Sequence, residues 1–315
     1  MRRRKFIALL AGAASWPLAG QAQDRKRTVG ILVVGSPDPS AFLRTFEEGL
    51  RETGYGEVQL DIRSAEGKGE RLPELAAQLV RRKVDVIVGF QTPAVQAAKQ
   101  ATTEIPIVMD AGDPVGMGLV SSLARPGGNV TGMSAVTAEL APKSLEYLKQ
   151  MVPTCRLLGL FLNATDPFRK PFLEQNQAGV DRLGLQLKTV FVHGPDDLGS
   201  AFEAAAREKV DAVMIQPSIA VERAAALALA YRLPAASLAG LFPRTGGLMS
   251  YSADYSELWR TMAVYVAKIL NGAEPATLPV AQPTKFELII NLKTAKALGL
   301  LISPTLLASA DELIE

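Results

Sequence analysis

Two short apolar runs, each flanked by similar polar residues, stand out in the pattern of hydrophobic and polar positions. Residues 83–93 read KVDVIVGFQTP, and residues 209–218 read KVDAVMIQPS. Each run is nearly continuously apolar and stops at a short polar loop, after which a helical pattern begins. Such runs are typical of buried strands in a parallel sheet. Because ligands of open α/β sheets bind beyond the carboxyl ends of the strands, each loop is predicted to form one wall of a site.

The same landmarks surround both runs in the same order, which predicts an internal repeat. The shared landmarks are an upstream apolar strand pattern (29–34 and 157–162), a downstream proline (Pro106 and Pro234) and a GLxS segment (118–121 and 247–250). Their spacings are nearly equal in the two copies, which is hard to obtain by chance. A repeat of this size indicates two copies of one structural unit. We therefore predict an α/β protein with two doubly wound, Rossmann-like lobes.

Helical spacing of apolar residues alternates with the strand patterns in both halves of the chain. Phe42, Phe46 and Leu50 recur at such a spacing, and Gly54 ends their helix. The predicted helices span residues 42–50, 71–82, 94–102, 171–183, 200–208, 222–231, 255–270 and 292–298.

A glycine-rich turn, RPGGNVTG at residues 125–132, is predicted to be the crossing between the lobes. Its glycines do not indicate a phosphate-binding loop, because no Lys-Ser or Lys-Thr pair follows them. The predicted first lobe comprises residues 28–132 with part of 254–280, and the second comprises residues 133–253 with part of 281–315.

Composition narrows the range of functions. The 315 residues are 48% hydrophobic and 21% charged, and they include one cysteine and one histidine, Cys155 and His193. These counts exclude a disulfide framework, a cysteine-rich metal site and a cluster of histidine ligands. The net charge is +2, but residues 2–5 are all basic, so the rest of the chain has no basic excess for nucleic acid. We expect no metal, no cofactor and no nucleic-acid partner.

The first 22 residues have the pattern of a signal peptide. A basic MRRRKF start precedes a short apolar stretch at residues 7–19, and Gly20 and Ala22 provide small residues for cleavage. The arginines fit a twin-arginine signal or the basic start of a general secretory signal. We expect a mature chain that begins near Gln23 and is free in a bacterial periplasm, without a lipid anchor, because no cysteine lies near the cleavage point.

The loops after the predicted strands contain the chemistry of a small-molecule site. Hydroxyl groups that precede predicted helices favour a carboxylate, acidic residues favour an amino group, and aromatic rings favour an apolar body. Among the acids, Asp38, Asp113, Asp166 and Asp254 are candidates, although Asp113 also fits a turn before Pro114. The predicted binding residues are Ser36, Asp38, Phe90, Thr92, Asp113, Asn163, Phe168, Gln216, Ser218 and Tyr251. The predicted ligand is small, anionic or zwitterionic, with an apolar or aromatic body; sugars are the main rival.

Several segments also resemble a known family. GSPDP, QTPAVQAAKQAT, GDPVGMGLVSSLARPGGNVTG, GGLMSYSADY and LPVAQPTKFELIINLKTAKALGL resemble the substrate-binding proteins of ABC transporters, in the family that includes the tryptophan-binding-type receptors. The resemblance runs from about Val29 to the C-terminus. It implies a type I periplasmic binding protein fold, with a multi-strand hinge of three crossings and an aromatic amino acid between the lobes. The chain departs from that branch at Gln216, Pro217 and Ser218, where its members tend to carry an Asp-Asn pair.

These observations favour a monomeric binding protein of an ABC importer, which closes around an amino acid or related carboxylate and delivers it to a membrane permease. A periplasmic sensor that presents its ligand to a membrane receptor is the alternative. A periplasmic enzyme is less favoured, because no G-x-S-x-G motif occurs, and His193 lies in the other predicted lobe from Ser36 and Asp38. A repressor-type sensor is opposed by the signal peptide and by the missing helix-turn-helix pattern.

Overall fold

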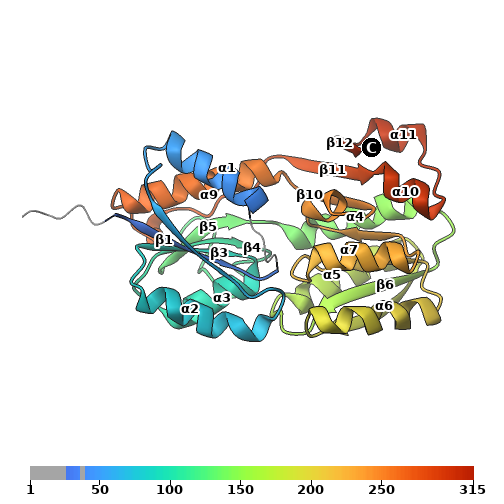
Figure 1. Cartoon of the computed structure of the whole chain (residues 1–315), viewed down its shortest axis with the longest axis horizontal. Helices are drawn as coiled ribbons and strands as arrows, with labels where there is room; N and C mark the ends of the chain where they lie inside the picture. Colours follow the sequence, from blue (N-terminus) through green and yellow to red (C-terminus); the bar gives the residue numbers. More distant parts are fainter. Residues whose placement is uncertain (1–25, 36–39) are drawn as a thin grey trace, which may run out of the picture.

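The computed structural model describes residues 26–35 and 40–315, which form two lobes side by side (Figure 1). The first lobe contains a wholly parallel sheet with the strand order β2-β1-β3-β4-β5. Its strands are β1 (Thr28–Val33), β2 (Gln59–Ser64), β3 (Val86–Phe90), β4 (Ile107–Ala111) and β5 (Val130–Ser134). Hydrophobic residues cover both faces of this sheet, as expected for buried parallel strands.

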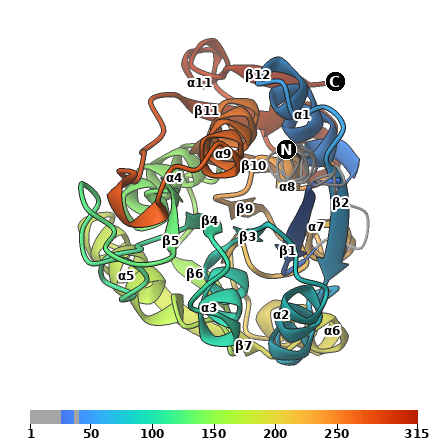
Figure 2. The same cartoon turned by 90° about the vertical axis from the view of Figure 1, so that its left-hand side faces the viewer.

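Helices pack on both faces of the first sheet (Figure 2). On one face lie α2 (Leu72–Arg81), which follows the short η1 (Gly69–Arg71), and α3 (Thr92–Ala101). On the other face lie α1 (Ser40–Glu52) and α9 (Tyr255–Leu270), which comes from the far end of the chain. The Trp259 ring of α9 is fully buried there, 5.8 Å from the Phe46 ring and 4.9 Å from the Phe90 ring between centroids.

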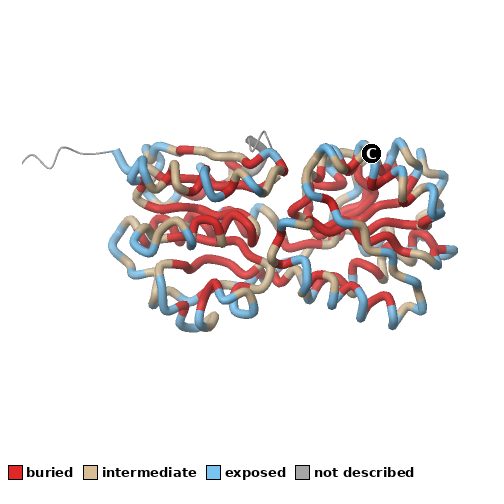
Figure 3. The backbone as a smooth tube through the Cα atoms, turned by 90° about the horizontal axis from the view of Figure 1, so that it is seen from below, coloured by how far each residue is buried: buried red, intermediate tan, exposed pale blue. Residues whose placement is uncertain are grey.

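The second lobe contains a seven-stranded sheet with the order β12-β11-β10-β9-β8-β6-β7, in which only β10 and β11 pair antiparallel. Its strands are β6 (Leu157–Asn163), β7 (Gln186–Val192), β8 (Ala212–Ile215), β9 (Ala235–Ser237), β10 (Met249–Ala253), β11 (Phe286–Asn291) and β12 (Glu312–Ile314). On one face pack α4 (Thr137–Met151), α5 (Arg169–Arg182), α10 (Leu292–Leu298) and α11 (Pro304–Ala308). On the other face pack α6 (Leu198–Arg207), α7 (Val221–Ala230) and α8 (Leu241–Arg244). Each lobe thus has its own buried core (Figure 3).

The internal repeat is confirmed down to single hydrogen bonds. The order β2-β1-β3-β4-β5 in one lobe corresponds to β7-β6-β8-β9-β10 in the other. The lysines of the two KVD segments, Lys83 and Lys209, both have a left-handed backbone, with φ of 54° and 56°. The aspartates two residues later also play one role. Asp85 accepts a hydrogen bond from the Thr28 N–H at 2.7 Å, and Asp211 accepts one from the Leu157 N–H at 2.9 Å.

The chain passes between the sheets at three places, as the family resemblance implied. The first passage lies between β5 and α4, a few residues after the glycine-rich turn, which leads into β5. The second joins β10 to α9 at Asp254, and the third leads from a bridge between Met133 and Ala281 into β11. The second and third are tied by a 3.0 Å hydrogen bond from the Asp254 N–H to the Lys285 carbonyl. These adjacent segments form the hinge.

No helix within residues 26–35 and 40–315 has both the length and the apolar character needed to cross a membrane.

Candidate ligand-binding site

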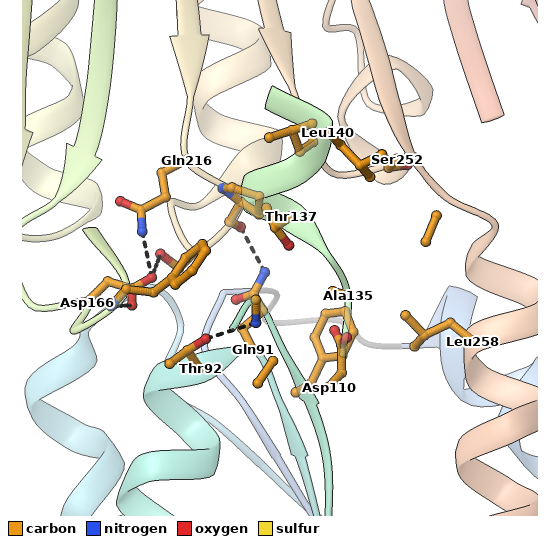
Figure 4. A pocket seen from close by; sticks show the side chains of 18 of the residues that line it. Gln91, Thr92, Asp110, Ala135, Thr137, Leu140, Asp166, Gln216, Ser252 and Leu258 are labelled. Carbon is orange, nitrogen blue, oxygen red and sulfur yellow. Dashed lines mark hydrogen bonds between the residues drawn. The ribbon is translucent and has the colours of Figure 1, made fainter. Parts of the chain in front are cut away.

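A pocket lies between the lobes, beyond the carboxyl ends of β3, β4 and β8 (Figure 4). It contains about 590 Å³ of space not filled by protein atoms. Residues of the first lobe, the second lobe and the hinge line it together, so the pocket exists only while the lobes are in contact. Its position is the one that parallel α/β sheets use for ligands.

Asp110 is the most unusual group in this pocket. It is the fourth residue of β4 and is only 5% exposed. Its Oδ1 atom is buried and has no hydrogen-bond partner among the described residues. Burial raises the pKa of Asp110 to about 7. A buried carboxylate without a partner is unfavourable in an empty pocket, so this side chain is suited to a cationic group brought by a ligand.

Two helices begin at the pocket, and both are preceded by an unusual backbone. Gln91, before α3, has φ of 71°, and Val136, before α4, has φ of 45°. Among the described residues, neither the Gln91 side chain nor the Val136 side chain makes a hydrogen bond that caps the helix it precedes. The first helical residues, Thr92 and Thr137, line the pocket and bring hydroxyl groups there. Helix N-termini favour the binding of a carboxylate. Strained backbone conformations, such as those of the two residues before these helices, are found most often at functional sites.

A second carboxylate, Asp166, is already satisfied by its own lobe. Its oxygens accept hydrogen bonds from the Phe168 N–H at 2.8 Å, the Gln216 amide at 2.8 Å and the Ser218 hydroxyl at 2.5 Å. Burial raises the pKa of Asp166 to about 6, although the Ser218 and Phe168 donors act in the opposite direction. Behind this group, the Asn163 N–H donates to the Gln216 side-chain oxygen at 2.9 Å. The Asp166 carboxylate therefore already has hydrogen-bond partners, and it stabilises the wall of the pocket that the second lobe forms.

The remaining walls are mostly apolar. The Phe90 and Tyr255 rings meet edge to face with centroids 6.1 Å apart, and Leu140, Leu238 and Leu258 also line the pocket. Burial and then the nearby Asp110 raise the pKa of Tyr255, which keeps its hydroxyl neutral. Within residues 26–35 and 40–315, the residues that line the pocket include Asp110 and Asp166 but no lysine, arginine or histidine. An apolar body with a positively charged group fits this combination.

Direct contacts between the lobes show that the pocket is closed. The Gln91 amide donates to the Pro217 carbonyl at 2.8 Å, across the cleft. At the rim, the Lys68 ammonium lies 3.5 Å from the Asp196 carboxylate. The Phe168 ring lies so close to Gly112 that a Cβ atom added to this glycine would be 2.7 Å from it. Gly112 is therefore needed for the close approach of the two walls.

A family model described as ABC transporter substrate binding protein matches residues 29–314. The chain belongs to this family. A tyrosine-binding protein of Clostridioides difficile is 24% identical over 310 residues, which are 93% of this chain and 89% of that protein. A domain from Streptococcus pneumoniae, solved in complex with L-Trp, is 28% identical and has a TM-score of 0.82, covering 92% of this chain and 100% of that one. A conserved domain protein from Vibrio cholerae is 29% identical with a TM-score of 0.82, covering 91% and 99%.

The binding protein brings half of the predicted site residues together in the pocket. The lining members of the predicted set are Phe90, Thr92, Phe168, Gln216 and Ser218. Asn163 stands behind them and positions Gln216 and Ser218 through hydrogen bonds. Ser36 and Asp38 lie outside the described residues.

Asp113 and Tyr251 are placed away from the pocket. The Asp113 carboxylate accepts a hydrogen bond from the Gly116 N–H at 2.9 Å, which is the turn role that its position before Pro114 allowed. Tyr251 points to the other face of β10, where its ring lies 5.3 Å from that of Tyr147. Its neighbour Ser252 lines the pocket instead.

The sequence analysis missed several lining residues, of which Asp110, Gln91 and Tyr255 matter most. Asp110 lies near the end of the apolar strand β4, and an acid in such a position is itself a signal for a site. Gln91 adjoins the predicted Thr92 and could have been included on that ground. Tyr255 begins a helix that belongs to the hinge, and no local pattern points to it. Asp254, considered as a partner for an amino group, caps that helix through the Ser256 and Glu257 N–H groups.

Proposed function

We propose that this binding protein captures a zwitterionic amino acid with an aromatic side chain between its lobes and delivers it to an ABC permease. The observation on which the proposal rests is the buried Asp110, whose Oδ1 atom has no hydrogen-bond partner among the described residues, in a pocket with no basic side chain among the described residues that line it. The ammonium group of an amino acid would supply the missing partner. Its carboxylate would lie at the starts of α3 and α4, where Thr92 and Thr137 offer hydroxyl groups beside helix N-termini.

The apolar walls support an aromatic side chain. Phe90, Tyr255 and Phe168 bring rings from the first lobe, the hinge and the second lobe, so a ligand ring would contact all three on closure. The ligands of two relatives agree with this chemistry, since one is named a tyrosine-binding protein and another was solved with L-Trp. No basic group is found among the described residues that line the pocket, which argues against a plain carboxylic acid, a class that the sequence had left open.

The same carboxylate explains how a ligand would drive closure. In the closed, empty pocket the Asp110 carboxyl group is buried and its Oδ1 atom has no hydrogen-bond partner among the described residues, so its ionised form is unfavourable there. An ammonium group removes that penalty and contributes a charge-assisted hydrogen bond. The ligand therefore binds the closed form better than the open form, which is the condition for shifting the equilibrium. A permease that contacts both lobes would then recognise the loaded protein.

The proposal is tested with matched ligands that differ by one group. L-Tryptophan, tryptamine and indole-3-propionic acid share a ring; tryptamine lacks the carboxylate, and indole-3-propionic acid lacks the ammonium group. Ligand at 100 times its Kd stabilises the folded protein by about 2.7 kcal/mol, which thermal-shift assays detect. We expect a clear shift with L-tryptophan or L-tyrosine, a smaller one with tryptamine and none with indole-3-propionic acid. A shift with sugars alone, or with the acid and not the amine, would refute the proposed ligand class.

Delivery to a permease is tested by uptake of labelled amino acid in cells that lack this protein. We expect uptake to be lost and to return with the wild-type chain, whereas normal uptake with a lost signalling response would favour the sensor alternative. Mass spectrometry of ligand recovered from the protein should show an unchanged molecule, because we propose binding without turnover. Export to the periplasm is part of the proposal and rests on the signal-peptide pattern of residues 1–22.

A further inference from the structure

The geometry points to Gln91 as the residue that limits the length of the ligand side chain, by separating the ligand pocket from a second, apolar chamber. This inference rests on the proposed function, because it concerns the selectivity of the same site. Both chambers lie between the lobes, and they share four lining residues: Phe90, Gln91, Pro217 and Tyr255. The second chamber is small and partly open to solvent: the space not filled by protein atoms there, about 440 Å³, includes the solvent at its mouth.

Gln91 forms a bar across the boundary between the chambers. Its side-chain nitrogen donates a 2.8 Å hydrogen bond to the Pro217 carbonyl of the opposite lobe (Figure 4). The other three shared residues contribute rings, and Gln91 contributes the amide that bridges the two lobes. Its Oε1 atom is buried and has no hydrogen-bond partner among the described residues.

The backbone conformation of Gln91 is unfavourable for a residue with a side chain. Its φ of 71° and ψ of 152° lie in a region that is favourable for glycine and strained for residues with a side chain. Glycine would relieve the strain at this position but would provide no bar. A strained residue at a ligand pocket is a sign of function when its side chain makes a contact that the relaxed residue could not make. The contact here is the hydrogen bond to the other lobe.

The lining of the second chamber defines what it would accept. Val33, Ile219, Val221, Ala239 and Leu241 make its walls apolar, and Glu222 is the one charged residue among the described residues that line it. An uncharged, apolar extension of an aromatic side chain fits such walls, whereas an anionic extension would be repelled by Glu222. With the bar in place, a ligand reaching past Phe90 would collide with the Gln91 amide. Without it, the pocket and the chamber would form one continuous cavity.

Paired ligands and variants test this inference. The probes are L-tyrosine and O-benzyl-L-tyrosine, which share both amino-acid charges and differ by one apolar ring. The variants are Gln91→Ala, which removes the bar, and Gln91→Gly, which also relieves the strained backbone. Gln96→Ala is the matched control, because Gln96 lies on the same helix but lines a surface groove instead of either chamber. Affinities are measured by calorimetry at one pH.

We expect the wild-type protein and Gln96→Ala to prefer L-tyrosine over O-benzyl-L-tyrosine by at least about 30-fold. Both Gln91 variants should reduce that preference at least tenfold, and Gln91→Gly should also have the higher melting temperature of the two. An unchanged preference in both folded variants would overturn the inference while leaving the proposed function intact. So would a wild-type protein that binds both probes equally.

A ligand-independent measurement keeps the inference testable if the wild-type protein binds no amino acid, a result that would refute the proposed function by itself. Xenon binds apolar cavities and is visible in crystals. Crystals of Gln91→Ala under xenon should show density at the join between the chambers, where the wild-type side chain stands. Density confined to two separate chambers, as in the wild type, would overturn the inference.

Discussion

Replacing Asp110 with asparagine tests the central electrostatic argument. The substitution keeps the size of the side chain and removes its charge, in a position that is 5% exposed and ends β4 at the ligand pocket. Two effects are expected, and they have opposite signs. The variant should bind an amino acid more weakly, because the ammonium group loses its partner. It should also close more readily without ligand, because no charge is then buried.

The size of both effects follows from the burial of the carboxyl group. Burial in the closed pocket raises the pKa of Asp110 from 3.8 to about 7. Each tenfold change in an ionisation equilibrium corresponds to about 1.4 kcal/mol, so the ionised carboxylate is disfavoured in the empty pocket by about 4 kcal/mol relative to a carboxylate in water. Loss of one partner from a buried charge pair weakens binding by about 2–5 kcal/mol, or about 30-fold to several thousand-fold in Kd.

The direction of the pH dependence follows from the same shift. Because the pKa of Asp110 is raised in the ligand-free structure, protonation stabilises this structure relative to the unfolded chain. This contribution is fully present below pH 3.8 and is lost as the pH rises through about 7. Ligand binding has the opposite dependence, since a proton on Asp110 competes with the ammonium group. Affinity should therefore fall as the pH is lowered from 7 towards 4, by at most about tenfold per pH unit.

Calorimetry with L-tryptophan or L-tyrosine between pH 5 and 8 measures the first effect, and small-angle X-ray scattering of the ligand-free protein measures the second. Asp113→Asn is the matched control, because its carboxylate accepts a hydrogen bond within a turn outside the pocket. We expect a pH-independent, weakened affinity and a smaller radius of gyration at pH 8 for Asp110→Asn only. Binding within threefold of the wild type, with the same pH dependence, would refute the reasoning.

Three further predictions concern the walls, the surface and the N-terminus. Gly112→Val should weaken ligand binding at least tenfold in calorimetry, because even a Cβ atom there would lie 2.7 Å from the buried Phe168 ring; wild-type affinity would show that closure does not need this contact. His193→Ala should leave Kd within about threefold, since its side chain is 73% exposed and contacts Asp197 at the surface; a 100-fold loss would contradict this placement. Intact-mass analysis of exported protein should find a chain that begins near Gln23, and retention of Met1 would contradict the predicted cleavage.

The architecture was predictable because its signals are local and occur twice. Each KVD segment combines a lysine with a left-handed backbone, an aspartate that accepts a hydrogen bond from the backbone of a neighbouring strand, and a continuous apolar run. Such a segment can be recognised within a short stretch of sequence. The common order of the segments around the two copies predicted the two-lobed fold. Helix α4 was missed for an equally local reason, since Pro142 lies inside it and interrupts the pattern that would identify it.

The site was harder to predict because the choice between adjacent residues depends on distant pairing. Tyr251 and Ser252 both lie in β10, and strand register decides which of them faces the pocket. Asp110 and Asp113 stand three residues apart, and the extension of β4 to Ala111 leaves one in the pocket and the other in a turn. Tyr255 reaches the site only because the hinge brings α9 back to the first lobe.

That return of α9 has a consequence for biosynthesis. One face of the first sheet is covered by a helix whose buried Trp259 is encoded far downstream of β5. Roughly 140 residues separate the end of β5 from the end of α9, and a ribosome adding 5–20 residues per second needs roughly 7 to 30 seconds to make them. During that interval the nascent first lobe exposes the apolar surface that α9 will cover, and chaperones can hold it unfolded. The order in which the helices are synthesised therefore delays completion of the first lobe until α9 has been made.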